Sequence, residues 1–119
     1  VGHFHKKEVK SLADLTKATQ GLAKHEAKIL LCHNPDYWEH KVWEDASVAL
    51  TLSGHTHAGQ LGVDFFGKIY SPVALLYSNY NGLYTHENQH LYVSHGLGYI
   101  GLPFMLGIRP EFNVITLKK

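Results

Sequence analysis

The chain has 119 residues, 45% of them hydrophobic and 18% charged, a globular composition that excludes a disordered or collagen-like chain. The net charge of +1, counted with neutral histidines, excludes the basic field that attracts nucleic acid, so we expect no nucleic-acid partner. A single cysteine stands against ten histidines. It is Cys32, at the end of an apolar run, a position typical of a buried thiol in a reducing compartment such as the cytoplasm.

The first predicted element is an amphipathic helix over residues 11–24. Ser11 and Asp14 resemble a capping box at its start, and apolar residues recur at helical spacing from Leu12 to Leu22. We expect this helix to pack one face against a hydrophobic core.

Two short apolar runs, residues 29–32 and 48–52, come next. Neither run alternates polar with apolar residues, which predicts strands buried on both faces of an α/β sheet. Between them, residues 34–36 supply an N-cap asparagine, a proline and an early acid, which predict the start of a helix. The strand–helix–strand order favours a parallel crossover. We expect the aromatic side chains of the helix to lie in the core: Tyr37, Trp38 and Trp43.

Beyond Leu61 the sequence consists of short runs rich in valine, isoleucine, tyrosine and phenylalanine, separated by glycine, proline and asparagine. This pattern predicts hairpins. The clearest hairpin runs from residue 84 to residue 92 about a turn at residues 87–89. A glycine-rich loop at residues 95–103 then leads to a last predicted strand over residues 112–117.

Three histidines stand directly after the two predicted buried strands, His33 after the first and His55 and His57 after the second. Ligand sites of open α/β sheets gather beyond the C-terminal ends of such strands, and imidazole is a common ligand of divalent transition metals. A His-x-His step alone is more often structural, but the third histidine at the same edge favours a metal site. Gly54 and Gly59 flank the pair and allow backbone conformations that a side chain would forbid.

Several segments resemble successive motifs of the calcineurin-like metallophosphoesterases, most closely those of a bacterial branch of small, often membrane-attached phosphodiesterases and phosphohydrolases. The resemblance spans residues 29–117 and rests on Ile-Leu-Leu-Cys-His-Asn-Pro-Asp at 29–36, Leu-Ser-Gly-His-Thr-His-Ala-Gly-Gln at 52–60, Tyr-Val-Ser-His-Gly-Leu-Gly at 92–98 and Gly-Leu-Pro at 101–103. It implies a metal-dependent hydrolase of phosphodiesters or phosphomonoesters. It leaves open a membrane association through a segment outside this chain.

The same resemblance implies a role for each of the three histidines. His33 and His55 match ligands of the second of two divalent ions (manganese, iron or zinc), and His57 matches a ligand of the first. The family's other ligands, in Asp-x-His, Gly-Asp and Gly-Asn-His motifs, do not occur in this sequence. Three neutral imidazoles supply no bridging carboxylate, so we expect the chain alone to bind at most one ion. The expected general acid is also missing, so we expect no catalytic residue in this chain and no activity from it alone.

The fold that the resemblance implies is a four-layer α/β/β/α sandwich with a mixed sheet and flanking helices, of which residues 1–119 would be the C-terminal portion. The expected partners are a phosphoester substrate and the N-terminal half of the same protein, with a homodimer through the exposed sheet face as an alternative. Two other hypotheses remain open. One is a module that binds a single metal ion through three histidines, and the other is a non-catalytic fragment.

The remaining histidines give weaker signals. His95 stands where relatives commonly have an arginine, and it either binds the phosphate of the substrate or is a loop histidine bonded to backbone. His3 and His5, on one face of a first strand, are a minor metal candidate. We expect a structural role near Glu111 for Arg109. Surface positions are expected for the other histidines: His25, His40, His86 and His90.

Overall fold

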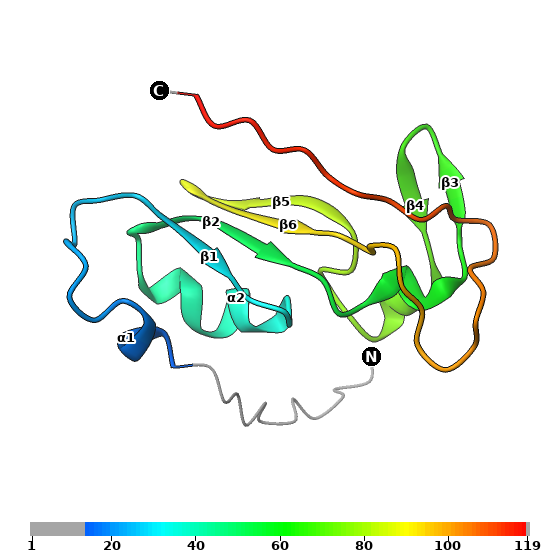
Figure 1. The fold of residues 1–119 in the computed structure, drawn as a ribbon, viewed down its shortest axis with the longest axis horizontal. Coiled ribbons are helices and arrows are strands. Elements are labelled where there is room, and N and C mark those ends of the chain that lie inside the picture. The colour runs from blue at the N-terminus through cyan, green and yellow to red at the C-terminus, as the bar shows by residue number, and fades with distance from the viewer. Residues whose placement is uncertain (1–13, 119) are drawn as a thin grey trace.

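A four-stranded mixed sheet forms the centre of the computed structural model, which describes residues 14–118. Strands β1 (Lys28–Leu31), β2 (Val48–Ser53) and β6 (Gln89–Val93) run parallel side by side. Strand β5 (Gly82–His86) pairs antiparallel with β6, which gives the order β1-β2-β6-β5 (Figure 1). The mixed α/β sheet and the parallel pairing of β1 with β2 confirm the predicted fold class and crossover.

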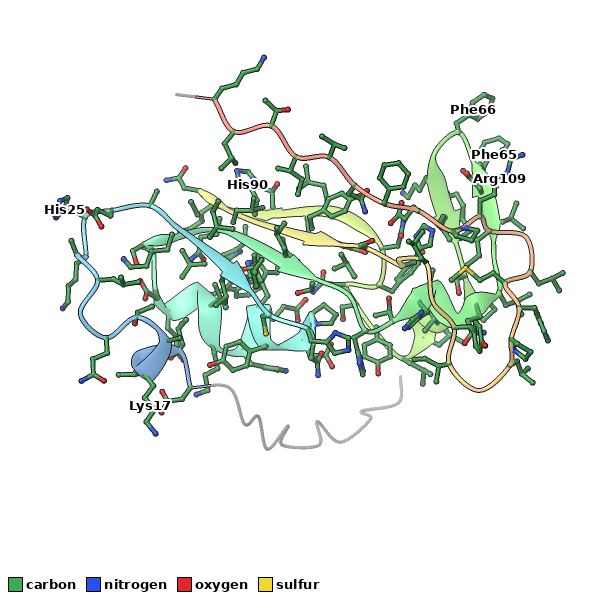
Figure 2. All side chains as sticks on the ribbon, in the orientation of Figure 1. Lys17, His25, Phe65, Phe66, His90 and Arg109 are labelled. Atoms are coloured by element: carbon green, nitrogen blue, oxygen red, sulfur yellow. The ribbon has the colours of Figure 1, made fainter. Side chains whose placement is uncertain are left out.

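Two hairpins follow the predicted pattern of short strands and turns. Strands β5 and β6 are joined by a tight turn in which Glu87 has a φ of 51°. Strands β3 (Val63–Phe65) and β4 (Lys68–Tyr70) form a separate two-stranded sheet. Its turn residues Phe66 and Gly67 have φ values of 51° and 78°, the left-handed backbone that tight hairpin turns require. Figure 2 shows Phe65 and Phe66 at the tip of this hairpin.

Helix α2 (Asp36–Lys41) covers one face of the sheet. It begins as predicted, because the side-chain oxygen of Asn34 accepts a hydrogen bond from the backbone N–H of Asp36 at 2.9 Å. The helix continues into a 3-10 turn, η1 (Val42–Glu44). Its apolar side packs on β2 and β6 and makes the main core: Tyr37, Trp38, Val42, Val48, Leu91 and Val93.

The prediction of a core position is confirmed for Tyr37 and Trp38 and is wrong for Trp43. Trp43 is 40% exposed, and its ring stacks on that of His86 with the centroids 3.8 Å apart. The reason is that Trp43 lies in the 3-10 turn, whose tighter winding moves it off the apolar stripe of the α-helix. His86 is therefore a half-buried stacking partner and not the surface residue that we expected.

The first helix is much shorter than predicted. Helix α1 covers Leu15–Ala18 and buries no residue, although Asp14 does cap it by accepting a hydrogen bond from the backbone N–H of Lys17 at 3.0 Å. The helix ends at its C-cap Thr19, and Gly21, with a φ of 82°, keeps the chain from resuming it. Residues 11–13 of the expected helix lie outside the described residues. No helix within residues 14–118 is both long and apolar enough to cross a membrane.

The sheet is covered on one face only within the described residues. Ile29, Leu31 and Leu83 point away from α2 and are 48%, 78% and 65% exposed, because side chains alternate between the two faces of a strand. The prediction of strands buried on both faces is therefore wrong for β1. We call this surface the open face of the sheet.

The C-terminal segment, residues 112–117, is extended but is not a strand, contrary to the prediction. Figure 1 shows it on the side of the sheet opposite α2, where the hydroxyl of Tyr92 donates to the side-chain oxygen of Asn113 at 2.6 Å. Phe112 and Val114 are 81% and 85% exposed. A strand needs a neighbouring backbone to complete its hydrogen-bond ladder, and no residue within 14–118 fills that place.

Candidate metal centre

His33 and His55 lie side by side at the C-terminal edge of the sheet. Each follows one of the paired parallel strands β1 and β2, and the backbone N–H of Gly54 donates to the carbonyl of His33 at 3.1 Å. The ring centroids of the two histidines are 5.1 Å apart and their planes meet at 80°. His33 is exposed and His55 is half-buried, so that the pair is open to solvent on one side.

His57 belongs to a loop with an unusual backbone. The 3-10 segment η2 (His57–Gln60) is broken by positive φ values, and His55, His57, Ala58 and Gln60 are non-glycine residues with φ between 47° and 72°. Such backbone is costly for residues with a Cβ and collects at functional sites. Gly59 has the left-handed backbone that we expected of the flanking glycines, with a φ of 67°. On the N-terminal side of the two histidines, His55 has a positive φ and Gly54 does not.

Side-chain hydrogen bonds select one nitrogen on each of the two loop imidazoles. Nδ1 of His57 lies 3.0 Å from the carbonyl oxygen of Gly98, which can only accept, so Nδ1 carries the proton and the lone pair is on Nε2. On His55 the contact is on the opposite nitrogen, because Nε2 lies 3.1 Å from the hydroxyl of Tyr77. The ring nitrogen without such a contact is therefore Nε2 on His57 and Nδ1 on His55.

The electrostatic environment favours a neutral His55. Burial lowers the pKa of His55, and the nearby imidazoles of His33 and His57 lower it further, while the carboxylate of Asp36 opposes them. Neutral imidazole is the form that binds metals. The pKa of Asp36 is itself raised, mainly by burial.

These donors fit part of a metal site. Within residues 14–118, no three side chains of the histidine, cysteine, aspartate or glutamate types are arranged as a complete set of ligands. His33 and His55 form a close pair of imidazoles, whereas the ring of His57 is held by the loop that contains Gly98. Further ligands, above all carboxylates, would have to come from outside the described residues.

The glycine-rich loop is fastened to the histidine loop through Gln60. The side-chain amide of Gln60 donates to the carbonyls of Leu102 and Phe104 at 2.7 and 2.8 Å, and its oxygen accepts from the N–H of Ile100. No pattern in the sequence predicted this role, although Gln60 follows the His-Thr-His segment by three residues. These three hydrogen bonds of Gln60 hold the glycine-rich loop so that the carbonyl of Gly98 lies beside His57.

His95 is buried, with 4% of its surface exposed, and both ring nitrogens are engaged. Nε2 donates to the carbonyl of Arg109 at 2.7 Å, while Nδ1 lies 2.7 Å from the side-chain oxygen of Asn81 and 3.0 Å from the carboxylate of Glu111. These contacts match the expected loop histidine bonded to backbone. Arg109 contributes its carbonyl to this structural cluster, and its own side chain is exposed (Figure 2).

The other candidates within the described residues give no further ligand for this site. His25, His40 and His90 are exposed as expected, and Figure 2 shows His25 and His90 far from the β3–β4 hairpin. Burial raises the pKa of the half-buried Cys32 thiol, in agreement with the expected unreactive cysteine. His3 and His5 lie outside the described residues.

Comparison with known proteins identifies several metallophosphoesterases as relatives. The chain is 42% identical over 91 residues to the metallophosphoesterase YkuE of Bacillus subtilis, a match covering 76% of this chain and 30% of that protein. It is 38% identical over 92 residues to the phosphodiesterase YaeI of Escherichia coli, covering 76% of this chain and 32% of the relative. A protein of Danio rerio, named transmembrane protein with metallophosphoesterase domain, is 35% identical over 111 residues. This match covers 89% of this chain and 23% of that protein.

No family model and no solved structure matches the chain. The chain spans about a third or less of the length of these curated relatives, as a C-terminal portion would. The relatives' names agree with the family resemblance of the motif segments, and they imply the use of divalent metal ions in general. The chain therefore belongs to the metallophosphoesterases and corresponds to a part of such a protein.

Proposed function

We propose that this chain supplies His33, His55 and His57 to a two-ion centre that hydrolyses a phosphodiester or a phosphomonoester, and that a segment outside the chain completes the centre. The observation that supports this most is the pairing of His33 with His55, 5.1 Å apart at the ends of two parallel strands. The names of the relatives, metallophosphoesterases and a phosphodiesterase, point to the same chemistry.

Each histidine has a definable part in such a centre. His55 and His57 hold their rings through Tyr77 and the carbonyl of Gly98, which leaves one nitrogen of each ring for an ion. His33 is exposed and can turn its ring toward the same space. The ions, manganese, iron or zinc, would supply charge neutralisation at the phosphoryl group and a nucleophile at neutral pH.

The missing functions belong to the completing segment. Two cations held about 3.5–4 Å apart need bridging carboxylates. Asp36 is the carboxylate that acts electrostatically on His55, but its pKa is raised and it lies in the first turn of α2. A general acid for the leaving group is also required. We therefore propose that the chain alone binds at most one ion and does not turn over substrate.

The open face of the sheet is the proposed contact for the completing segment. It exposes the apolar side chains of Ile29, Leu31 and Leu83, and the C-terminal segment beside it exposes Val114 and Leu117. Exposed apolar patches of several hundred Å² are uncommon on soluble monomers. Covering about 400 Å² would contribute about 10 kcal/mol at 25 cal/mol per Å², comparable with the stability of a whole domain.

The experiment measures hydrolysis of a nitrophenyl phosphodiester by this chain with excess manganese or zinc, alone and mixed with a separately made upstream half. We expect no turnover by the chain alone, and metal-dependent turnover with a stable complex when both halves are present. Turnover by the chain alone that is lost in His57→Ala would refute the need for a second half. A stable monomer that ignores the upstream half would refute the proposed contact, and a homodimer would assign the open face to a second copy.

A further inference from the structure

The hydroxyl of Tyr77 contacts the imidazole of His55. Its oxygen lies 3.1 Å from Nε2, and the two rings meet edge to face, with centroids 5.7 Å apart and planes at 77°. Tyr77 is 22 residues away in the chain and lies outside every motif of the sequence analysis. Nothing in the chemistry described so far requires a tyrosine at this place.

Tyr77 is held rigidly relative to the histidine loop. It follows the 3-10 turn η3 (Pro72–Leu75), and its backbone N–H donates to the carbonyl of Val73 at 3.0 Å. Ser71 caps the same turn by accepting from the N–H of Val73 at 3.1 Å, and its hydroxyl donates to the carbonyl of Ala58 at 2.7 Å. One serine therefore joins the turn that carries Tyr77 to the loop that carries His55.

A close approach at Gly59 strengthens this connection. A Cβ built on Gly59 would lie 2.8 Å from the Cβ of Val73, a separation that real Cβ atoms almost never show. Only glycine lets the loop and η3 pack this closely. The position of the Tyr77 ring against His55 is thus fixed by packing as well as by hydrogen bonds.

The contact has a specific consequence for metal binding. A metal-binding imidazole uses the lone pair of one ring nitrogen, while the N–H of the other is held by an oxygen atom. We propose that Tyr77 is a positioning residue, whose hydroxyl oxygen accepts a hydrogen bond from Nε2–H of His55 and thereby leaves the lone pair on Nδ1 for the ion. This inference rests on the proposed metal role of His55.

His57 is held at the opposite ring nitrogen. There a backbone carbonyl, that of Gly98, holds Nδ1–H and leaves Nε2 for the ion. The two histidines of the His-x-His step would therefore use opposite nitrogens. A backbone carbonyl cannot be removed by substitution, but the hydroxyl of Tyr77 can.

The test uses the complete protein that carries this chain, with ¹⁵N-labelled histidine, and compares Tyr77→Phe with Tyr80→Phe. Tyr80→Phe is a matched control, because the hydroxyl of Tyr80 donates to the carbonyl of Ile69 at 2.9 Å. In the metal-free parent and the control we expect His55 as the Nε2–H tautomer. In Tyr77→Phe we expect a mixture of both tautomers and roughly tenfold weaker Co²⁺ binding in a chelator competition, against less than about a twofold change in the control.

The possible results separate the inference from the proposed function. An Nδ1–H tautomer of His55 in the parent would overturn the inference without need of any variant. An unchanged tautomer and unchanged Co²⁺ affinity in Tyr77→Phe would also overturn it. Unchanged Co²⁺ affinity in His55→Ala would instead refute the metal role of His55 itself.

Discussion

Replacing Gly59 by alanine tests whether the histidine loop depends on its close packing against η3. The new Cβ would lie 2.8 Å from the Cβ of Val73 and 3.1 Å from the hydroxyl oxygen of Ser71. The φ of 67° adds the cost of a left-handed residue, about 1–2 kcal/mol. Overpacking adds about 1–3 kcal/mol, so that we expect a total loss of roughly 2–5 kcal/mol in the free energy of unfolding.

Gly21→Ala is the matched control for this measurement. Gly21 has a φ of 82°, but no atom lies within 4 Å of the Cβ that alanine would add, so only the backbone cost of about 1–2 kcal/mol applies. Urea denaturation of both variants gives the difference directly. We also expect Gly59→Ala to weaken Co²⁺ binding, because it displaces Ser71 and with it Tyr77. Equal destabilisation of the two variants, within about 0.5 kcal/mol, would refute the close packing of the loop on η3.

Three further predictions follow from the core and from two perturbed side chains. Trp38→Ala should lower the free energy of unfolding by roughly 3–5 kcal/mol. Trp43→Ala should lower it by less than about half of that, because of the two tryptophans only Trp38 is buried. Equal losses of stability in urea denaturation would contradict this prediction. The pKa of Asp45 is lowered mainly by the Ser47 hydroxyl, which donates a hydrogen bond to the Asp45 carboxylate at 2.6 Å. The ionised carboxylate therefore stabilises the folded state above a pH of about 4, and this stabilisation is lost as the pH falls through the lower pKa of the folded state. In Asp45→Asn the free energy of unfolding should therefore fall less steeply below a pH of about 4. An unchanged dependence on pH would contradict this prediction. Because burial raises the pKa of Cys32, a thiol reagent at pH 8 should label the folded protein much more slowly than the urea-unfolded chain; equal rates would show an open thiol.

Local patterns in the sequence were sufficient where the structure depends on near neighbours. The start of α2 follows from Asn34 and its hydrogen bond to the N–H of Asp36 two residues on. The β5–β6 hairpin follows from a turn of a few residues at Glu87. Burial was harder to predict, because the apolar run of β1 gives no sign that its Leu31 is 78% exposed.

The predicted last strand shows the same limit. Residues 112–117 have the composition of a strand and an extended backbone, but a strand is completed by a partner, and the described residues provide none. Trp43 was predicted to be buried on helical spacing, and the change to a 3-10 turn placed it on the surface. For the last strand the missing information was the position of another segment, and for Trp43 it was the local change of helix type.

The sequence by itself determined the family and the strand–helix–strand order, and it singled out His33, His55 and His57 as candidates for a ligand role, because these features are carried by short contiguous motifs. Only the tertiary structure decided which ring nitrogen of each loop imidazole has a hydrogen-bonding neighbour. That choice depends on Tyr77 and Gly98, which lie 22 residues from His55 and 41 residues from His57 in the chain. No sequence pattern predicts such contacts, since they arise from the packing of η3 and of the glycine-rich loop against the left-handed backbone at Gly59 and Gln60.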